Sequence, residues 1–261
     1  MNRRGFALLA VLWVLTALTA LTGAGLVVAR LGSETTRNRV LLARAEWARE
    51  ACGEILLARF AADPATRHIT TTDLGRGTWC RATVNDPAAR LNVNTAEHGV
   101  VAQLFRALGV SLAVAESVTA SRRRGTIYDL RQVEGMDSTL AARLAPFVTT
   151  RGPGAVNVNA ARQEVLMLLP GMTEEGAALL ISRRSTRRFR SVDEFAGALS
   201  RSSRARLLKS YADFVRGTVF DPPQLIATVE GGVRGTPIVA RATLTMVPVP
   251  GRLAIIRRET E

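Results

Sequence analysis

Residues 1–30, MNRRGFALLAVLWVLTALTALTGAGLVVAR, decide how this chain of 261 residues is organised. Between Arg4 and Arg30 no residue carries a formal charge, which leaves positions 5 to 29 uncharged. At about 1.5 Å rise per residue, a helix of this length spans a hydrocarbon core of about 30 Å with some tilt. A cleaved secretory signal has a shorter apolar region, of about 7–15 residues. The stretch therefore predicts a transmembrane helix over residues 6–29, with a secretory signal as the weaker alternative.

The start of this anchor carries a more specific pattern, Arg3-Arg4-Gly5-Phe6. A basic pair and a glycine stand immediately before the aromatic residue that opens the apolar helix. This pattern resembles the leader of type IV prepilins and type II secretion pseudopilins, which a peptidase cuts after the glycine before the new amino terminus is methylated. The resemblance implies that residues 1–5 form the leader, that cleavage falls between Gly5 and Phe6, and that Phe6 is N-methylated. Mature position five is then Ala10, where most of that superfamily carries glutamate.

The charge of the chain is strongly basic, with a formal net charge of +13. A basic chain invites a nucleic-acid interpretation. The basic residues are scattered, however, and the densest run is Arg183-Arg184-Ser185-Thr186-Arg187-Arg188. Aromatic residues that could stack on single-stranded bases are not interleaved with them. Arginines flank both ends of the anchor, so the positive-inside rule does not fix its orientation. Charge is therefore weak evidence for any one partner.

Cysteine and histidine are both scarce, which limits the chemistry of the chain. Cys52 and Cys80 cannot build a four-cysteine zinc site and form no C-x-x-C motif. Outside the cytoplasm they can form one disulfide, and inside it they are expected as small buried apolar residues. His68 and His98, the two histidines, lack metal-ligand spacing such as H-E-x-x-H. The sequence has no Walker motif and no G-x-S-x-G, so we expect no enzyme activity, no catalytic residues and no metal ligands.

The chain beyond the anchor predicts a helix packed on a sheet. No proline interrupts the helical pattern before Pro64, and apolar residues recur at three- and four-residue steps, namely Leu41, Ala45, Ala48, Cys52 and Ile55. One helix is therefore expected over residues 6–61, apolar in its first half and amphipathic in its second. Patterns typical of β-strands cover residues 66–72, 78–85, 225–230, 238–247 and 253–256. An antiparallel sheet against the amphipathic half follows from this arrangement.

An internal repeat occupies the helical segment between these strands. The sequence LNVNTA at 91–96 returns as VNVNAA at 156–161, and Ser121-Arg122-Arg123 returns as Ser182-Arg183-Arg184. Two copies of about 60–65 residues each, 86–150 and 151–215, thus predict an inserted all-α domain. We expect its paired asparagines to serve helix caps and turns rather than chemistry.

The glycine turns of this insert, such as Glu134-Gly135-Met136 and Leu169-Pro170-Gly171-Met172, resemble helix-hairpin-helix motifs. In DNA-binding examples of such motifs, backbone amides at the turn hold phosphates. The same motifs are also common as packing units. A membrane-anchored DNA-binding protein of the competence type is therefore the alternative function.

The order of all these parts resembles the type II secretion minor pseudopilin K family (GspK) over nearly the whole chain. The resemblance implies an α+β fold in which the long N-terminal helix packs on a small antiparallel sheet, with an inserted all-α domain of two helix-hairpin-helix-like repeats. It implies a single-pass inner-membrane protein with a periplasmic domain, placed at the pseudopilus tip with other minor pseudopilins. The major pseudopilin filament and the prepilin peptidase are its further partners, and no nucleic acid is expected.

The resemblance also divides the chain and gives Ala10 a meaning. The expected parts are the leader 1–5, the transmembrane part 6–29, the amphipathic helix with the first strands 30–85, the insert 86–215 and the last strands 216–261. In such filaments the glutamate at mature position five neutralises the amino terminus of a neighbour on the tip side. A first subunit has no such neighbour, and an unpaired carboxylate in lipid costs a few kcal/mol or more. Some family members bind calcium, for which no ligands can be assigned here.

Overall fold

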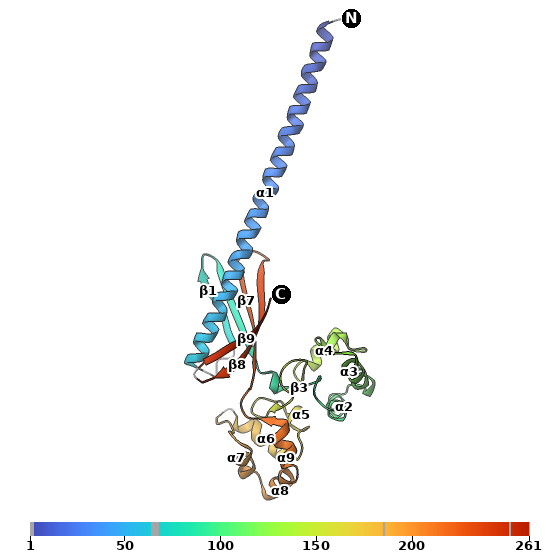
Figure 1. Ribbon diagram of the computed structural model, residues 1–261, viewed down its shortest axis with the longest axis vertical. Helices are drawn as coiled ribbons and strands as arrows, with labels where there is room; N and C mark the ends of the chain where they lie inside the picture. Colours follow the sequence, from blue (N-terminus) through green and yellow to red (C-terminus); the bar gives the residue numbers. More distant parts are fainter. Residues whose placement is uncertain (1–2, 64–67, 185, 251, 261) are drawn as a thin grey trace.

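A single long helix dominates the computed structural model, which describes residues 3–63, 68–184, 186–250 and 252–260, with side chains only from residue 11 onward. This helix, α1 (Arg3–Ala62), runs for 60 residues and projects far from the rest of the chain (Figure 1). At about 1.5 Å rise per residue it is about 90 Å long. The predicted continuous helix is therefore confirmed, and its C-terminal part lies against a sheet.

The sheet formed by the described residues has five strands in the order β1-β2-β7-β8-β9, and every neighbouring pair is antiparallel. Its strands are β1 (His68–Gly75), β2 (Thr78–Asn85), β7 (Leu225–Val233), β8 (Val239–Val249) and β9 (Arg252–Thr260). The start of the predicted strand 66–72 lies outside the described residues, and β9 is longer than predicted. The pair β2–β7 matches Thr83 with Thr228 and Asn85 with Ile226. The helical segment is thus inserted between two adjacent strands.

The helix and the sheet share one apolar core. Along β7 alternate side chains face α1, and Leu225, Ala227 and Val229 are buried there. The stripe of α1 that meets them is fully buried and consists of Ala45, Ala48, Cys52 and Leu56. The three- and four-residue spacing of this stripe matches the helical period, while the two-residue alternation of β7 matches the pleat of a strand. The amphipathic half of the helix is therefore confirmed.

Gly231 sets how closely α1 approaches the sheet. A Cβ atom built on this glycine would lie 2.2 Å from the amide nitrogen of Arg49 and 2.5 Å from the carbonyl oxygen of Ala45. Both of these atoms belong to the helix backbone, which cannot rotate away as a side chain can. The small residues at Ala45 and Ala48 extend the same close contact. Glycine is thus required on β7 for the helix backbone to pass directly over the strand.

The first copy of the repeat is a helical unit closed by a short pair of parallel strands. It contains β3 (Leu91–Asn92), α2 (His98–Ala107), α3 (Leu112–Arg124), the 3-10 helix η2 (Leu130–Gln132), α4 (Ser138–Leu144) and β4 (Val148–Thr149). A further 3-10 helix, η1 (Pro87–Ala89), connects β2 to it. Leu91 pairs with Val148 in the parallel strands. The prediction of an insert without strands is therefore wrong at these positions, because two-residue strands lack a hydropathy period.

The second copy repeats this plan with more helices at its end. It contains β5 (Val156–Asn157), α5 (Gln163–Leu166), α6 (Glu174–Arg183), α7 (Val192–Ala198), α8 (Arg201–Lys209), α9 (Tyr211–Gly217) and β6 (Thr218–Val219). Val156 pairs with Thr218 in parallel, as Leu91 pairs with Val148 in the first copy. Both copies lie beyond the end of the sheet, on the side away from the projecting part of α1 (Figure 1).

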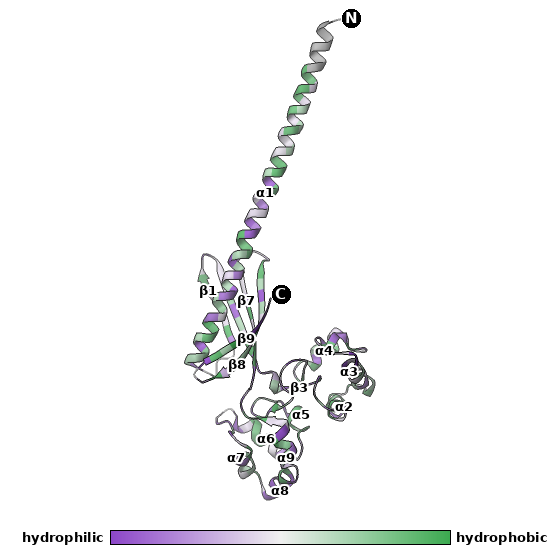
Figure 2. Cartoon of the chain, in the orientation of Figure 1, coloured by the Kyte–Doolittle hydropathy of each residue, from purple (hydrophilic) through white to green (hydrophobic). Residues whose placement is uncertain are grey.

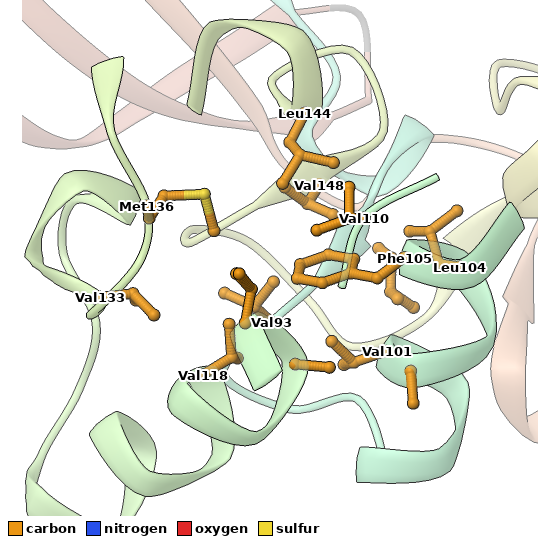
Figure 3. Packing of buried hydrophobic residues seen from close by; sticks show 14 of the residues in the cluster. Val93, Val101, Leu104, Phe105, Val110, Val118, Val133, Met136, Leu144 and Val148 are labelled. Atoms are coloured by element: carbon orange, nitrogen blue, oxygen red, sulfur yellow. The ribbon is translucent and has the colours of Figure 1, made fainter. Parts of the chain in front are cut away.

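Each copy has a separate apolar core. In the first, Phe105 is fully buried among aliphatic side chains that include Val93, Val110 and Val148 (Figure 3). In the second, Phe195 packs edge-on against Phe189 and is stacked on Phe214, with ring centroids 5.4 and 6.0 Å apart. The core of the first copy is thus mainly aliphatic, while the core of the second contains three packed aromatic rings. An ion pair of 2.9 Å between Arg151 and Glu259 connects the insert to β9.

Candidate functional site

The projecting part of α1 exposes apolar side chains on all sides. The exposed large side chains here are Val11, Leu12, Trp13, Val14, Leu15, Leu18, Leu21, Leu26, Val27, Val28 and Leu31. Figure 2 shows this part in green and white, with strongly hydrophilic residues concentrated further along the helix. An 18-residue window of the described helix Val11–Ala62 has a mean hydropathy of 2.1, and none of that window is buried. A helix that is apolar all round and unburied is compatible with a membrane anchor.

The threonines of this segment have their hydroxyl groups satisfied within the helix. Thr16, Thr19 and Thr22 donate to the carbonyl oxygens of the residues four positions earlier, at 3.0, 2.7 and 2.6 Å. An unsatisfied hydroxyl in hydrocarbon costs several kcal/mol, as a rough scale. These internal bonds remove that cost without a partner helix. The segment is therefore compatible with lipid despite its polar residues.

The expected processing site lies at the N-terminal end of α1. Gly5, Phe6 and Ala10 belong to the helix by their backbone, and their side chains lie outside the described residues. The structure therefore shows where these three residues lie in the helix, but it describes no contacts of their side chains. Cleavage after Gly5, methylation of Phe6 and the role of Ala10 stay predictions.

The two cysteines lie together in the core between α1 and the sheet. Cys52 and Cys80 are fully buried free thiols of the same apolar cluster. Burial raises the pKa of the Cys52 thiol, and its interaction with the neighbouring Cys80 raises it further. The expectation that β2 brings Cys80 within reach of Cys52 agrees with this contact. Whether they form a disulfide in the cell stays a prediction.

The first asparagine pair holds the first copy of the repeat together. The side-chain oxygen of Asn92 accepts a hydrogen bond of 2.9 Å from the amide of Asn94. The side-chain nitrogen of Asn94 donates to the carbonyl oxygens of Ile127 and Thr150, at 2.8 and 2.9 Å. Its side-chain oxygen accepts from the amide of Ile127 at 2.9 Å. Asn94 thus joins three segments of chain and has no further N–H group to offer.

The second asparagine pair repeats this arrangement. Asn157 accepts from the amide of Asn159 at 3.0 Å, and Asn159 donates to the carbonyl oxygens of Phe189 and Phe220, both at 2.8 Å. In addition, Asn157 donates to a carboxylate oxygen of Asp86 at 2.7 Å, which connects the second copy to the end of β2. The expected turn-bonding role is therefore observed, while these asparagines cap no helix.

A pair of partly buried arginine contacts corrects the predicted register of the repeat. The guanidinium of Arg122 donates to the carbonyl oxygen of Ala96, and that of Arg184 donates to Ala161 at 2.7 Å. Arg122 therefore corresponds to Arg184 and not to Arg183. The predicted match is wrong by one residue, because consecutive arginines align equally well in two registers. The asparagine and alanine matches, 94 with 159 and 96 with 161, hold.

The turns of the helical hairpins are engaged within the protein. At the predicted turn Glu134-Gly135-Met136, the amide of Met136 donates to the carbonyl oxygen of Val133 at 3.0 Å. At the predicted turn Leu169-Pro170-Gly171-Met172, a Cβ atom on Gly171 would lie 3.0 Å from the backbone of Arg206 and Leu207. Helix α8 therefore covers the second turn. Both turns serve as packing units, and neither favours the DNA-binding alternative.

The charged group most deeply buried in the sheet is Glu230 on β7, whose side chain is 8% exposed. It lies between Arg81 on β2 and Arg241 on β8, and both arginines bind its carboxylate, Arg241 at 2.6 and 2.7 Å. Burial by itself raises the pKa of Glu230, but the hydrogen bonds and charges of the two arginines outweigh it and hold the pKa below its usual value. This fully paired carboxylate is a structural link across three strands.

Among the described residues no group of three or more His, Cys, Asp or Glu side chains could hold a metal ion. His68 is exposed at the start of β1, and His98 lies at the start of α2 with its Nδ1 atom 2.7 Å from the Thr119 hydroxyl. The calcium that some family members bind therefore gains no ligands from the part of this chain that the structure describes.

Comparison with known proteins finds a family match for part of the chain. Residues 156–213, which form most of the second copy, match the family model described as type II secretion system (T2SS), protein K. No curated protein sequence gives a significant match to the chain. The resemblance to the type II secretion protein K family is thus confirmed on the second copy of the repeat.

The fold gives an independent comparison. The chain is similar to a protein in the crystal structure of the GspK-GspI-GspJ complex from the enterotoxigenic Escherichia coli type 2 secretion system. The TM-score is 0.62 at 16% sequence identity, and the match covers 87% of this chain and 99% of that one. The α+β fold expected from the sequence, a long N-terminal helix with an antiparallel sheet and further helices, is therefore confirmed.

Proposed function

We propose that this protein is a non-enzymatic minor pseudopilin that occupies the tip of a type II secretion pseudopilus. The observation that carries the proposal is the position of the two helical copies, beyond the end of the sheet opposite to the anchor (Figure 1). A filament subunit that carries another subunit above it must leave the end of its sheet opposite to the anchor free for that contact. About 130 residues of helical insert, from 86 to 215, obstruct it, and the family match falls within them. The chain therefore suits the first position of a filament.

The anchor defines where the protein acts. We place α1 across the inner membrane, because its exposed apolar segment is long enough to span it and ends near Leu31. The sheet and the insert then lie in the periplasm, because the leader pattern at Gly5 and Phe6 resembles one that is cut on the cytoplasmic side. The solved relative forms a complex with GspI and GspJ, so other minor pseudopilins are the expected partners at the tip. The major pseudopilin filament then extends below, and its growth exports folded proteins across the outer membrane. The chain initiates and caps that filament.

The same proposal assigns the amino terminus. Prepilin peptidase cuts between Gly5 and Phe6, and Phe6 becomes the N-methylated first residue of a helix that stays in the membrane. This processing separates a pseudopilin from an ordinary anchored protein, which keeps Met1, and from a secreted one, which loses the whole apolar segment.

Mass spectrometry of the protein purified from membranes tests this assignment. We expect a mature chain that begins with N-methylated Phe6 in cells that contain the peptidase. A Gly5→Val variant is the matched control and should keep its leader, because the glycine of the pattern is lost. An intact Met1 in the unaltered protein, or cleavage beyond residue 20, contradicts the proposal.

A further inference from the structure

A polar pocket of about 430 Å³ lies in the first copy of the repeat, away from the anchor and the sheet. Its lining includes His98 from α2, Thr119, Arg122 and Arg123 from α3, and Thr126 from the segment after α3. None of the described residues that line it carries a carboxylate. Guanidinium groups offer N–H donors in a planar fork, and the Thr126 hydroxyl adds one donor, since the Thr119 hydroxyl is engaged with Ala115 and His98. The pocket thus gathers hydrogen-bond donors and positive charge without an acid to neutralise them.

The arginines of this pocket have donors to spare. Arg122 uses one N–H for the carbonyl oxygen of Ala96, and a guanidinium carries five. Arg123 forms no hydrogen bond or ion pair with any described residue, and the same holds for the Thr126 hydroxyl. The next residue, Arg124, donates to the Ser121 hydroxyl at 3.3 Å and does not line the pocket. Arg123 and Thr126 are therefore unengaged at the same opening.

The second copy shows that the fold does not need these residues. In the register set by Asn94 with Asn159 and by Arg122 with Arg184, the second copy has other residue types at the pocket positions: Gln163, Ile181 and Ser185 stand for His98, Thr119 and Arg123. The structural contacts of Arg122 and Asn94 are kept in Arg184 and Asn159, and Arg188 stands for Thr126, but His98, Thr119 and Arg123 have no counterpart of the same type. The pocket is thus an addition to the repeat and not one of its packing contacts.

One carboxylate that pairs with arginines of the second copy has no counterpart in the first. In the second copy Glu194 pairs with Arg183 at 3.2 Å and lies 3.7 Å from Arg187. The residue at the position of Glu194 in the first copy is Gln132, because Asp129 and Ser191 are the equivalent N-caps. The C-terminus of α3 favours arginines in its last turn through the helix dipole, which explains their presence there. His98 and Thr119, which are hydrogen-bonded to each other at 2.7 Å, lie at the same opening.

We propose that this pocket binds a tetrahedral oxyanion, a phosphate or sulfate group. Such an anion presents acceptor oxygens in several directions, which suits donors that converge from α2, from α3 and from the segment that follows α3. A planar carboxylate offers two oxygens and leaves part of this donor set unused. The ligand is either the free anion or the phosphate of an ester, and the two present the same group to the pocket.

Calorimetric titration of the full chain in a neutral detergent and a phosphate-free buffer tests the proposal. We expect saturable binding of inorganic phosphate at one site per chain, with Arg123→Gln weakening it about tenfold, the loss of one charge-assisted contact. Arg124→Gln removes the same charge one residue away and should leave the affinity unchanged. Glycerol 1-phosphate in a parallel titration separates the sources, because tighter binding of the ester assigns an esterified ligand and weaker binding assigns the free anion.

Three results would overturn the proposal. These are the absence of saturable phosphate binding at millimolar concentration, equal losses in Arg123→Gln and Arg124→Gln, and binding of acetate as tight as that of phosphate. Both arginines are exposed. Thermal unfolding of the two variants should match that of the unaltered chain, so that a change in affinity reports on the pocket.

Discussion

Whether the contact between Cys52 and Cys80 becomes a disulfide depends on the cellular compartment of this part of the chain. The structure holds them as neighbouring buried thiols, and burial raises the pKa of Cys52. A raised pKa keeps a thiol protonated and slow to react in the folded protein. In the periplasm, where we propose that this part of the chain lies, oxidising enzymes would act on it as it folds, before the core closes. We therefore propose that the pair is oxidised in the cell.

A disulfide here would close a loop from residue 52 to residue 80 and stabilise the folded chain by about 3–4 kcal/mol in the loop-entropy model. Alkylation of the denatured protein followed by mass spectrometry should find neither thiol modified unless a reductant is added first. Denaturation matters, because buried thiols resist alkylation in the native state even when they are reduced. Modification of both cysteines without reductant would show that the pair stays reduced.

Individual residues also show where sequence reasoning reached its limit. The paired asparagines were expected to make turn bonds, and they do, but their long-range partners at 127, 150, 189 and 220 could not be predicted from local patterns. The one-residue error at Arg183 has a similar cause, since a run of arginines carries no period. Side-chain contacts between distant segments decide both.

At the scale of elements, the contact between α1 and β7 depends on the absence of one side chain. Gly231→Ala would place a methyl group 2.2 Å from the amide nitrogen of Arg49, so the helix must move away from the sheet. We expect a loss of stability of about 3 kcal/mol, at the upper end for an overpacked core. Thermal or denaturant unfolding of the full chain in detergent measures it.

Gly53 on the same helix gives the matched control. A methyl group there would meet the nearest atom, on Leu244, at 3.7 Å, which is an ordinary contact. Alanine is also the better helix former, so Gly53→Ala should leave stability unchanged or raise it by about 0.5–1 kcal/mol. Equal losses in the two variants would refute the close-approach argument.

The sheet contains a charge network that makes its stability depend on pH. The folded pKa of Glu230 is lowered, so the carboxylate contributes stability above its unfolded pKa of about 4.3 and loses it as the pH falls through the folded value. Because Arg81 and Arg241 are about half exposed, the contribution is modest, about 1–2 kcal/mol.

Unfolding temperatures between pH 7 and pH 3 test this dependence. Glu230→Gln keeps the shape but removes the charge, and it should lower stability at pH 7 while flattening the decline below about pH 4. A variant that declines as steeply as the unaltered chain would show that other carboxylates govern the acid transition. No periodicity in the sequence pointed to this network, because the pairing of β2, β7 and β8 was unknown.

Prediction of whole elements succeeded where the pattern was long. Helix α1 and strand β2 were placed within a few residues, since each has many apolar positions in one period. The short strands β3 to β6 were missed, and β9 extends past its predicted end because pairing with β8, not composition, supports its charged last residues. Local patterns thus located the elements, while non-local pairing fixed their ends.

At the scale of the whole molecule, Ala10 is proposed to mark the chain as a first subunit. An Ala10→Glu variant would place a carboxylate in lipid with no neighbour to pair it, at a cost of a few kcal/mol or more. We expect reduced secretion of a folded substrate and reduced recovery of other minor pseudopilins with the tagged chain. Ala10→Gln, which has the same shape without the charge, should be milder. Unimpaired secretion in both variants would contradict the proposal that Ala10 marks the first subunit.

The insertion between β2 and β7 has a consequence for how the protein folds. The sheet cannot close until the chain has been made past Val233, so about 140 residues must be bridged, and closing an unstructured loop of that length costs about 4 kcal/mol in chain entropy. Each helical copy has its own core and joins its own ends through parallel strands, which brings Asn85 and Leu225 closer before they are needed. We therefore expect the insert to fold first and to bring β2 and β7 together. The sheet, which lies nearer the membrane anchor, then forms last.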